Sequence, residues 1–298
     1  MTNLSNTKAT LIGGTAVLMW ATLALFTTLS GQVPPFQLAA MSFGVAFIVS
    51  LGRWMVIGTG ILGALRQKPS VWLIGTGGLF GYHFFYFMAL QNAPPVEAGL
   101  IAYMWPLLIV VCSALLPGEK LRWWHVVGAL SGLAGTTLLV TGGSGLSGFK
   151  SEYWLGYTMA CLCALTWTGY SLLSRRHADV PTDVVGGFCG ATALLATLCH
   201  LFFETTIWPE QSVQWIAIIA LGLGPVGLAF FTWDIGVKRG NIQVLGALSY
   251  AAPLLSTIVL IVFGLGDLTW VVAAACLLIV GGAVLASREI LKPGPSVP

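Results

Sequence analysis

Long apolar runs, separated by short clusters of charged and turn-forming residues, constrain this chain of 298 residues more than any other feature. Only 8% of its residues are charged, and its mean hydropathy is +0.89. A soluble domain carries about 25% charged residues, so this chain lacks the charge to cover a surface that faces water. Because about 20 apolar residues in a helix span a bilayer, the sequence predicts an all-α, polytopic membrane protein.

Ten apolar runs are predicted to form membrane-spanning helices. Several of their boundaries contain turn-forming sequences such as "GQVPP", "RQKPS" and "PGEK". The predicted helices cover residues 10–30, 36–57, 71–91, 95–116, 123–141, 153–174, 182–204, 212–236, 241–264 and 268–287.

The basic residues alternate between the predicted loops. If the N-terminus lies inside, twelve of the 13 Lys and Arg residues fall on the inner side and only Lys150 falls outside. Inner loops of membrane proteins carry an excess of Lys and Arg, so this pattern predicts two cytoplasmic termini and an even number of helices. The twelve predicted inner residues are Lys8, Arg53, Arg66, Lys68, Lys120, Arg122, Arg175, Arg176, Lys238, Arg239, Arg288 and Lys292.

The chain also repeats itself. "AYMWPLL" at 102–108 resembles "SYAAPLL" at 249–255, and an offset of 147 residues aligns both phrases without a gap. The same offset pairs Trp20 with Trp167 and Trp123 with Trp270. These matches indicate a duplicated five-helix unit, with residues 1–147 as the first repeat and 148–298 as the second, in one integrated membrane domain.

An odd number of helices in each unit has a topological consequence. The second unit must begin on the side opposite to the first, which predicts an inverted repeat related by an axis in the membrane plane. Transporters of this architecture bind substrate near the midplane between the two halves and work by alternating access.

Three further segments point to a known family: "MW" at 19–20, "EAGLIAYMWPLLIVV" at 97–111 and "NIQVLGALSYAAPLLS" at 241–256. With the duplication, they resemble the drug/metabolite transporter superfamily with EamA-type repeats. Within it, these segments look like those of bacterial exporters of aromatic amino acids. The resemblance implies an inner-membrane exporter of amino acids, aromatic ones included, whose partners are its small-molecule substrate and the lipid bilayer.

Aromatic residues that lie deep in the predicted helices are candidates for lining a substrate cavity. Trp and Tyr at helix ends, such as Trp208 and Trp270, are typical of the interfacial belts of membrane proteins. The alternative for the deeper ones is ordinary helix packing. We predict that substrate contacts Trp20, Tyr82, His83, Tyr86, Tyr103, Trp105, Trp167 and Tyr250.

Two prolines and several glycines are candidates for bends. Pro106 and Pro253 lie inside predicted helices at equivalent positions, where each removes a backbone donor and disturbs the preceding turn. They are interpreted as bends that open a carbonyl to the cavity, or else as static kinks. Gly77 and Gly224 are candidate hinges, although small residues at helix contacts are common in membranes.

Ionisable residues within the predicted spans are few. His83 is the one candidate near mid-membrane, either as a functional group or as a neutral imidazole bonded to a neighbouring helix. Asp234 is predicted to pair with Lys238 four residues later at an inner helix end. Glu97 is interpreted as a favourable acid at a helix N-terminus.

Other classes of function receive little support from the residues. Neither a nucleophile–base pair nor a metal-ligand triad is recognised, so the chain is not predicted to be an enzyme, and neither cofactor nor metal is expected. Nucleic acid and an obligatory protein partner are not expected either. The alternative within the same superfamily is an exporter of drugs or lipophilic cations, which would use a similar aromatic cavity.

Overall fold

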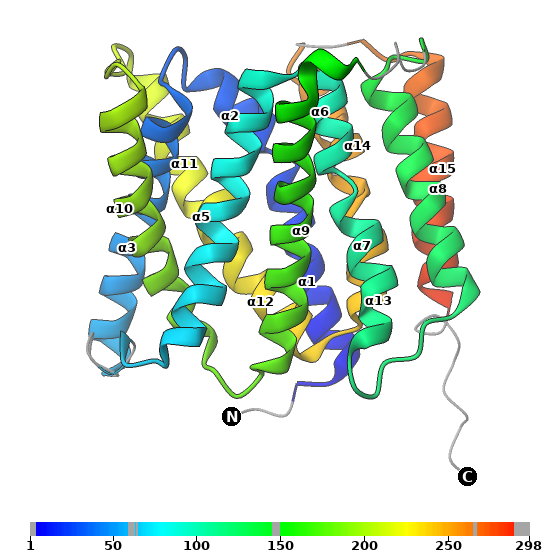
Figure 1. Ribbon diagram of the computed structural model, residues 1–298, viewed down its shortest axis with the longest axis horizontal. Coiled ribbons are helices and arrows are strands. Elements are labelled where there is room, and N and C mark those ends of the chain that lie inside the picture. The colour runs from blue at the N-terminus through cyan, green and yellow to red at the C-terminus, as the bar shows by residue number, and fades with distance from the viewer. Residues whose placement is uncertain (1–3, 59–62, 64, 145–149, 265–266, 289–298) are drawn as a thin grey trace.

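The computed structural model describes residues 4–58, 63, 65–144, 150–264 and 267–288. All regular structure in these ranges is helical (Figure 1). The helices of the first half are α1 (Asn6–Trp20), α2 (Leu23–Leu29), α3 (Pro35–Ile57), α5 (Pro69–Asn92), α6 (Pro95–Ala102), α7 (Trp105–Cys112), the 3₁₀ turn η1 (Ser113–Leu115) and α8 (Trp123–Val140).

The second half follows the same plan. Its elements are η2 (Ser151–Tyr153), α9 (Trp154–Arg176), η3 (Thr182–Val184), α10 (Val185–Phe203), α11 (Ser212–Leu223), the π-helical segment η4 (Gly224–Leu228), α12 (Ala229–Arg239), α13 (Ile242–Ser249), α14 (Ala251–Val262) and α15 (Trp270–Ala286).

These helices lie where the apolar runs predicted them, with ends that differ by no more than about four residues. In the described ranges, 8 helical segments are long and apolar enough to cross a membrane, and α15 is a shorter apolar helix of 17 residues. Helix α9 has 23 residues but a more polar sequence. The all-helical membrane fold expected from the sequence is therefore confirmed.

Proline and capping residues explain where several helices begin. Helices α3, α5 and α6 each start with proline, whose fixed φ suits the first turn and whose missing N–H would have no partner there. The side chains of Asn241 and Thr269 accept hydrogen bonds from the first turns of α13 and α15. The chain thus turns sharply between consecutive helices.

Two membrane-crossing segments are broken at equivalent places. Helices α6 and α7 are separated by Tyr103 and Met104, just before Pro106. Helices α13 and α14 are separated by Tyr250, three residues before Pro253. Each interruption lies within three residues before a proline, whose ring clashes with the preceding turn.

A third break lies between α11 and α12, where the chain makes five residues of π-helix that include Pro225. Proline and π-bulges are common causes of local distortion in a helix. The candidate hinge Gly224 begins this segment, whereas Gly77 lies inside the uninterrupted helix α5.

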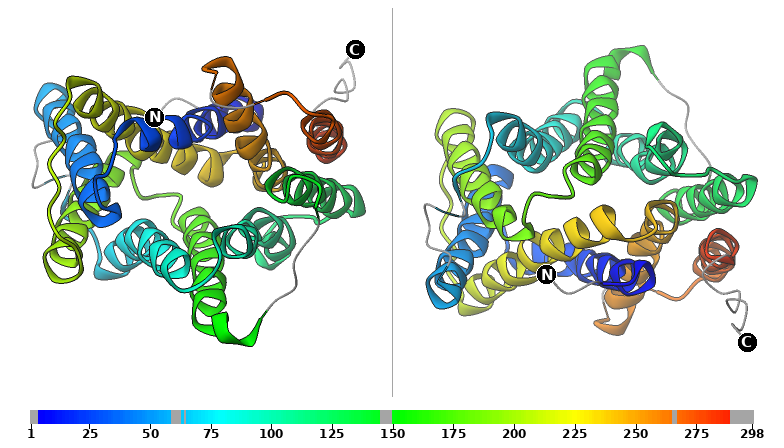
Figure 2. Two further views of the ribbon diagram at one scale, coloured as in Figure 1. Left: turned by 90° about the horizontal axis from the view of Figure 1, so that it is seen from above. Right: turned by 90° about the horizontal axis from the view of Figure 1, so that it is seen from below.

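Glycine contacts bring pairs of helices close together. A Cβ atom on Gly13 of α1 would lie 2.7 Å from Cα of Gly236 on α12, and one on Gly128 of α8 would lie 2.5 Å from the carbonyl oxygen of Gly282 on α15. Such close backbone approach strengthens helix packing in a bilayer. Seen from above and below, α8 and α15 lie together at the end of the molecule far from α3 and α10 (Figure 2).

Candidate functional site: a central aromatic cavity

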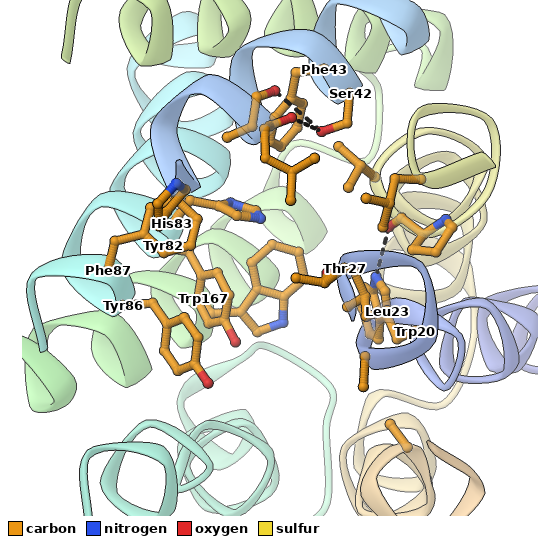
Figure 3. A pocket seen from close by; sticks show the side chains of 18 of the residues that line it. Trp20, Leu23, Thr27, Ser42, Phe43, Tyr82, His83, Tyr86, Phe87 and Trp167 are labelled. Carbon is orange, nitrogen blue, oxygen red and sulfur yellow. Dashed lines mark hydrogen bonds between the residues drawn. The ribbon is translucent and has the colours of Figure 1, made fainter. Parts of the chain in front are cut away.

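A cavity of about 630 Å³ lies between the helices and is lined mainly by apolar and aromatic side chains. Its volume is in the range typical of small-molecule sites. Figure 3 shows Tyr82, His83 and Tyr86 of α5 on one side, with Trp20, Leu23 and Thr27 of α1 and α2 across from them. The cavity also reaches Val33 and Pro35, in and just after the turn between α2 and α3.

Four tryptophans pack together at one end of the cavity. The ring centroid of Trp20 lies 5.7 Å from that of Trp167 and 5.1 Å from that of Trp233. Trp105 lies 6.2 Å from Trp167 and 5.8 Å from Trp233, with nearly perpendicular rings. We call Trp20, Trp105, Trp167 and Trp233 the tryptophan layer. Such edge-to-face contacts stabilise aromatic clusters beyond the area that they bury.

Hydrogen bonds fix two members of the tryptophan layer. The indole nitrogen of Trp20 donates to the carbonyl of Pro225 over 3.1 Å, so the π-helical segment holds this ring in place. The indole of Trp233 donates to Ser171 Oγ, also over 3.1 Å. The indole nitrogen of Trp167 is buried without a hydrogen-bond partner in the described part of the protein.

Helix α5 supplies one wall of the cavity because Tyr82 and Tyr86 lie one turn apart on the same face. Their rings are stacked, with centroids 6.1 Å apart and an interplanar angle of 5°. His83 follows on the adjacent face and packs edge-on against Phe43, with ring centroids 5.1 Å apart. The wall therefore presents aromatic faces together with two phenolic hydroxyls.

His83 makes a local backbone hydrogen bond. Its Nδ1 lies 2.7 Å from the carbonyl oxygen of Leu79, and a carbonyl only accepts, so Nδ1 carries the proton. In the neutral ring, Nε2 is then an acceptor. The imidazole is therefore bonded within α5, and not to a neighbouring helix as one alternative expected, and it also lines the cavity.

The cavity lining is uncharged in the described residues: it includes no Asp, Glu, Lys or Arg side chain. Its polar groups are hydroxyls, the His83 ring and the indole nitrogens. The lining hydroxyls belong to Thr27, Ser42, Tyr82, Tyr86, Tyr103 and Ser256. A site of this kind can hold a ring between aromatic faces and bind small polar groups through hydroxyl donors.

Beyond the tryptophan layer, toward the end where α1 begins and α15 ends (Figure 1), polar contacts join several helices. Arg175 at the end of α9 binds the carboxylate of Glu119 and donates to the carbonyls of Val237 and Gly240, both over 2.8 Å. Gln243 donates to the other oxygen of Glu119 over 3.0 Å. We call Glu119, Arg175 and Gln243 the polar cluster.

The predicted ion pair at the end of α12 is confirmed. Lys238 Nζ lies 2.9 Å from Asp234 Oδ2, and both side chains are buried. Thr182 donates to the same carboxylate oxygen over 2.7 Å, which links α12 to η3. Glu97 lies in the first turn of α6, as expected, and accepts a hydrogen bond from Tyr157.

Seven of the eight residues predicted to contact substrate line this cavity. They are Trp20, Tyr82, His83, Tyr86, Tyr103, Trp105 and Trp167. Tyr250 is fully buried outside the lining, and its hydroxyl accepts a hydrogen bond from the Leu107 amide. Pro253 lines the cavity, whereas Pro106 is buried in α7. The interfacial tryptophans Trp208 and Trp270 are 64% and 71% exposed, away from the cavity.

Sequence reasoning missed two phenylalanines of the site. Phe43 and Phe230 stack with centroids 5.7 Å apart and an interplanar angle of 2°, and both line the cavity. The 147-residue offset pairs Phe230 with His83, so the repeat itself contained a signal for Phe230. Phe43 pairs with Gly190 in that register and carried no such signal.

Comparison with known proteins establishes the class. The chain belongs to the EamA-like transporter family, whose model matches residues 7–141 and again residues 154–288. The two matches start and end 147 residues apart, which confirms the duplication and its register. The chain is therefore a membrane transporter and not an enzyme.

The relatives are named for one activity. The chain is 56% identical over 284 residues to a protein of Ancylobacter novellus named aromatic amino acid exporter YddG, covering 95% of this chain and 98% of the relative. A protein of Escherichia coli with the same name is 27% identical, over 93% and 96% of the two chains. A crystal structure with 54% sequence identity superposes with a TM-score of 0.91, covering 97% of this chain and all of the other.

Proposed function

We propose that this protein exports amino acids, aromatic ones included, from the bacterial cytoplasm by alternating access through the central cavity. The observation that carries the proposal is the cavity itself, which combines aromatic faces with hydroxyl donors and has no charged side chain in its described lining. The names of the relatives favour the same substrate class.

The lining matches the parts of an aromatic amino acid. The substrate ring stacks against the tryptophan layer and against Phe43 or Phe230. The ammonium group is held by cation–π attraction to these rings and by a carbonyl freed at a broken helix. The hydroxyls of Tyr82, Tyr86 and Tyr103 donate to the carboxylate.

The proposed architecture is ten membrane-crossing helices in two inverted halves, residues 1–147 and 148–298. Contacts between α8 and α15 support a two-fold relation. Gly128 meets Gly282, and Gly135 meets Ala275, which is the same pair with the halves exchanged. Ser131 also donates to the carbonyl of Leu278, the residue 147 positions later, over 2.8 Å.

In this proposal the molecule lies in the inner membrane with both termini in the cytoplasm. With the exception of Lys150, the described basic residues lie at or near the ends of helices on the side where α1 begins. This distribution agrees with the positive-inside pattern. The tryptophan layer and the polar cluster lie between the cavity and that side. The cavity extends instead toward Val33 and Pro35, the side that faces outward in the proposed orientation.

An exporter of lipophilic cations is the alternative. Such a substrate has no carboxylate, and a buried cation is usually balanced by an acidic group. The described lining offers hydroxyl donors and no Asp or Glu, which favours a zwitterionic substrate over a cation.

A substrate panel in proteoliposomes tests the proposal, with and without a proton gradient. Labelled phenylalanine and tryptophan are expected to be transported, and lipophilic cations are not. Transport of the cations without transport of any amino acid contradicts the proposal.

A further inference from the structure

We propose that Tyr250 is a positioning residue for transport: its hydroxyl holds the first turn of α7 at the break between α6 and α7, and so keeps Tyr103 and Trp105 in the cavity. The link to transport rests on the proposed function, whereas the hydrogen bond and its packing are features of the structure.

The break leaves a backbone donor without its usual partner. In a continuous helix, the N–H of Leu107 would donate to the carbonyl of Tyr103, four residues earlier. Tyr103 and Met104 form a turn between the two helices, and Leu107 instead donates to the hydroxyl oxygen of Tyr250 over 3.1 Å. A side chain from the second half thus satisfies a donor of the first half.

The Tyr250 ring packs in a space that depends on a glycine. The side chain is fully buried, and a Cβ atom on Gly132 of α8 would lie 2.6 Å from its Cδ2 atom. Only glycine at 132 leaves the ring in this place without displacement. Helix α8 and the first turn of α7 therefore fix Tyr250 from two sides.

The two halves differ at this point. Tyr103 is the equivalent of Tyr250 in the 147-residue register, yet Tyr103 lines the cavity and its hydroxyl has no side-chain hydrogen bond to the described residues. The equivalent of Gly132 is Ile279, which carries a large side chain where Gly132 has none. The arrangement is therefore present in one half, and the second break is only one residue long.

The geometry gives the hydrogen bond a direction of effect. While Leu107 is bonded to Tyr250, the first turn of α7 is held at the break that Pro106 imposes. When that bond is lost, the N–H of Leu107 has no partner at the break, the first turn of α7 opens more often, and Tyr103 and Trp105 leave their positions in the cavity. Loss of one neutral hydrogen bond changes such an equilibrium by about two- to ten-fold.

The test replaces only the hydroxyl. In Tyr250→Phe, amide hydrogen exchange in residues 103–112 is expected to be about two- to ten-fold faster, measured by mass spectrometry on the full-length protein in nanodiscs. Tyr153→Phe in η2 is the matched control, because its ring packs against Tyr157 away from the break. Gly132→Ala keeps the hydroxyl but displaces the ring, and is expected to act like Tyr250→Phe.

Transport kinetics separate positioning from mere stabilisation. Because fewer molecules are then in the binding-competent form, Tyr250→Phe is expected to raise the apparent KM for phenylalanine by up to about ten-fold, with a smaller change in maximal rate. A structural role alone would lower the melting temperature and the amount of active protein, and leave the apparent KM unchanged.

Each outcome decides between the two proposals. Unchanged exchange in residues 103–112 contradicts the role of Tyr250, as does faster exchange with an unchanged apparent KM. If exchange becomes faster as expected but the wild-type protein transports no amino acid, the proposed function is wrong. The role of Tyr250 in holding the first turn of α7 is then still supported.

Discussion

Trp20 and Trp167 are 147 residues apart in the chain, yet their ring centroids lie 5.7 Å apart at an angle of 75°. They occupy equivalent positions in the two matches of the family model. A pair of equivalent residues that meets at the cavity is what an interface between two repeated halves produces. It also explains why both halves retain a large aromatic residue at this position.

The close contact between α1 and α12 predicts a specific loss of stability. In Gly13→Ala, the added methyl group meets the backbone of Gly236 at 2.7 Å, which cannot move away as a side-chain tip can. We expect a destabilisation of about 1–3 kcal/mol, seen as a lower melting temperature in detergent. Gly44→Ala is the control, since a Cβ there meets no atom within 4 Å. Equal melting temperatures for the two variants contradict the packing argument.

The polar cluster predicts a gate at the end nearest the termini. Arg175→Gln removes the charge that binds Glu119 and weakens the bonds to Val237 and Gly240. Each lost bond to a charged group contributes about 1.5–3 kcal/mol, so the closed end should open more often. Hydrogen exchange in residues 237–243 is expected to become faster.

Arg176→Gln is the matched control for this gate. Arg176 is the neighbouring residue, and among the described residues its guanidinium makes one hydrogen bond, of 3.2 Å to the carbonyl of Leu115. If exchange in residues 237–243 responds equally to both substitutions, the polar cluster is not what holds this end closed.

The proposed orientation predicts the result of reporter fusions. Alkaline phosphatase is active only outside the cytoplasm, so a fusion after Lys150 should be active and a fusion after Lys68 inactive. Twelve of the 13 basic residues fall on the inner side in this orientation. The opposite pattern of activity rejects the proposed topology.

Energy coupling is predicted from the uncharged cavity. Because no described Asp or Glu lines it, we expect transport to run down the substrate gradient with at most loose dependence on a proton gradient. His83 is the one imidazole in the lining. Strict dependence on a proton gradient, abolished by His83→Gln, is the result that this prediction excludes.

Much of the fold could be predicted because membrane burial leaves a strong signal in sequence. The apolar runs and prolines located the helices, and the repeat register located Trp20, Trp167 and the two bends. Symmetry within the sequence thus brought together residues that are far apart in the chain.

The other features of the fold and the site could not be predicted, because they depend on differences between the repeats and on long-range contacts. Tyr250 was expected to line the cavity because Tyr103 does in the equivalent position, but Gly132 gives Tyr250 a different seat. The pairing of Arg175 with Glu119 joins the end of α9 to the loop before α8, and no periodicity in the sequence relates them. No sequence signal marked Phe43 as a residue of the cavity, because a phenylalanine in an apolar helix usually contributes only to packing.

The most direct test of the central claim is uptake of labelled phenylalanine or tryptophan into proteoliposomes that contain the wild type, Trp167→Ala or Tyr103→Ala. Removing an aromatic partner costs about 0.5–1.5 kcal/mol beyond the lost area, so both substitutions should weaken transport several-fold or more. Trp208→Ala and Trp270→Ala are the matched controls because both rings are largely exposed. The account predicts reduced transport for the cavity variants and near-normal transport for the controls, with equal size-exclusion profiles. Normal transport by Trp167→Ala and Tyr103→Ala, with loss in the two controls, would contradict it.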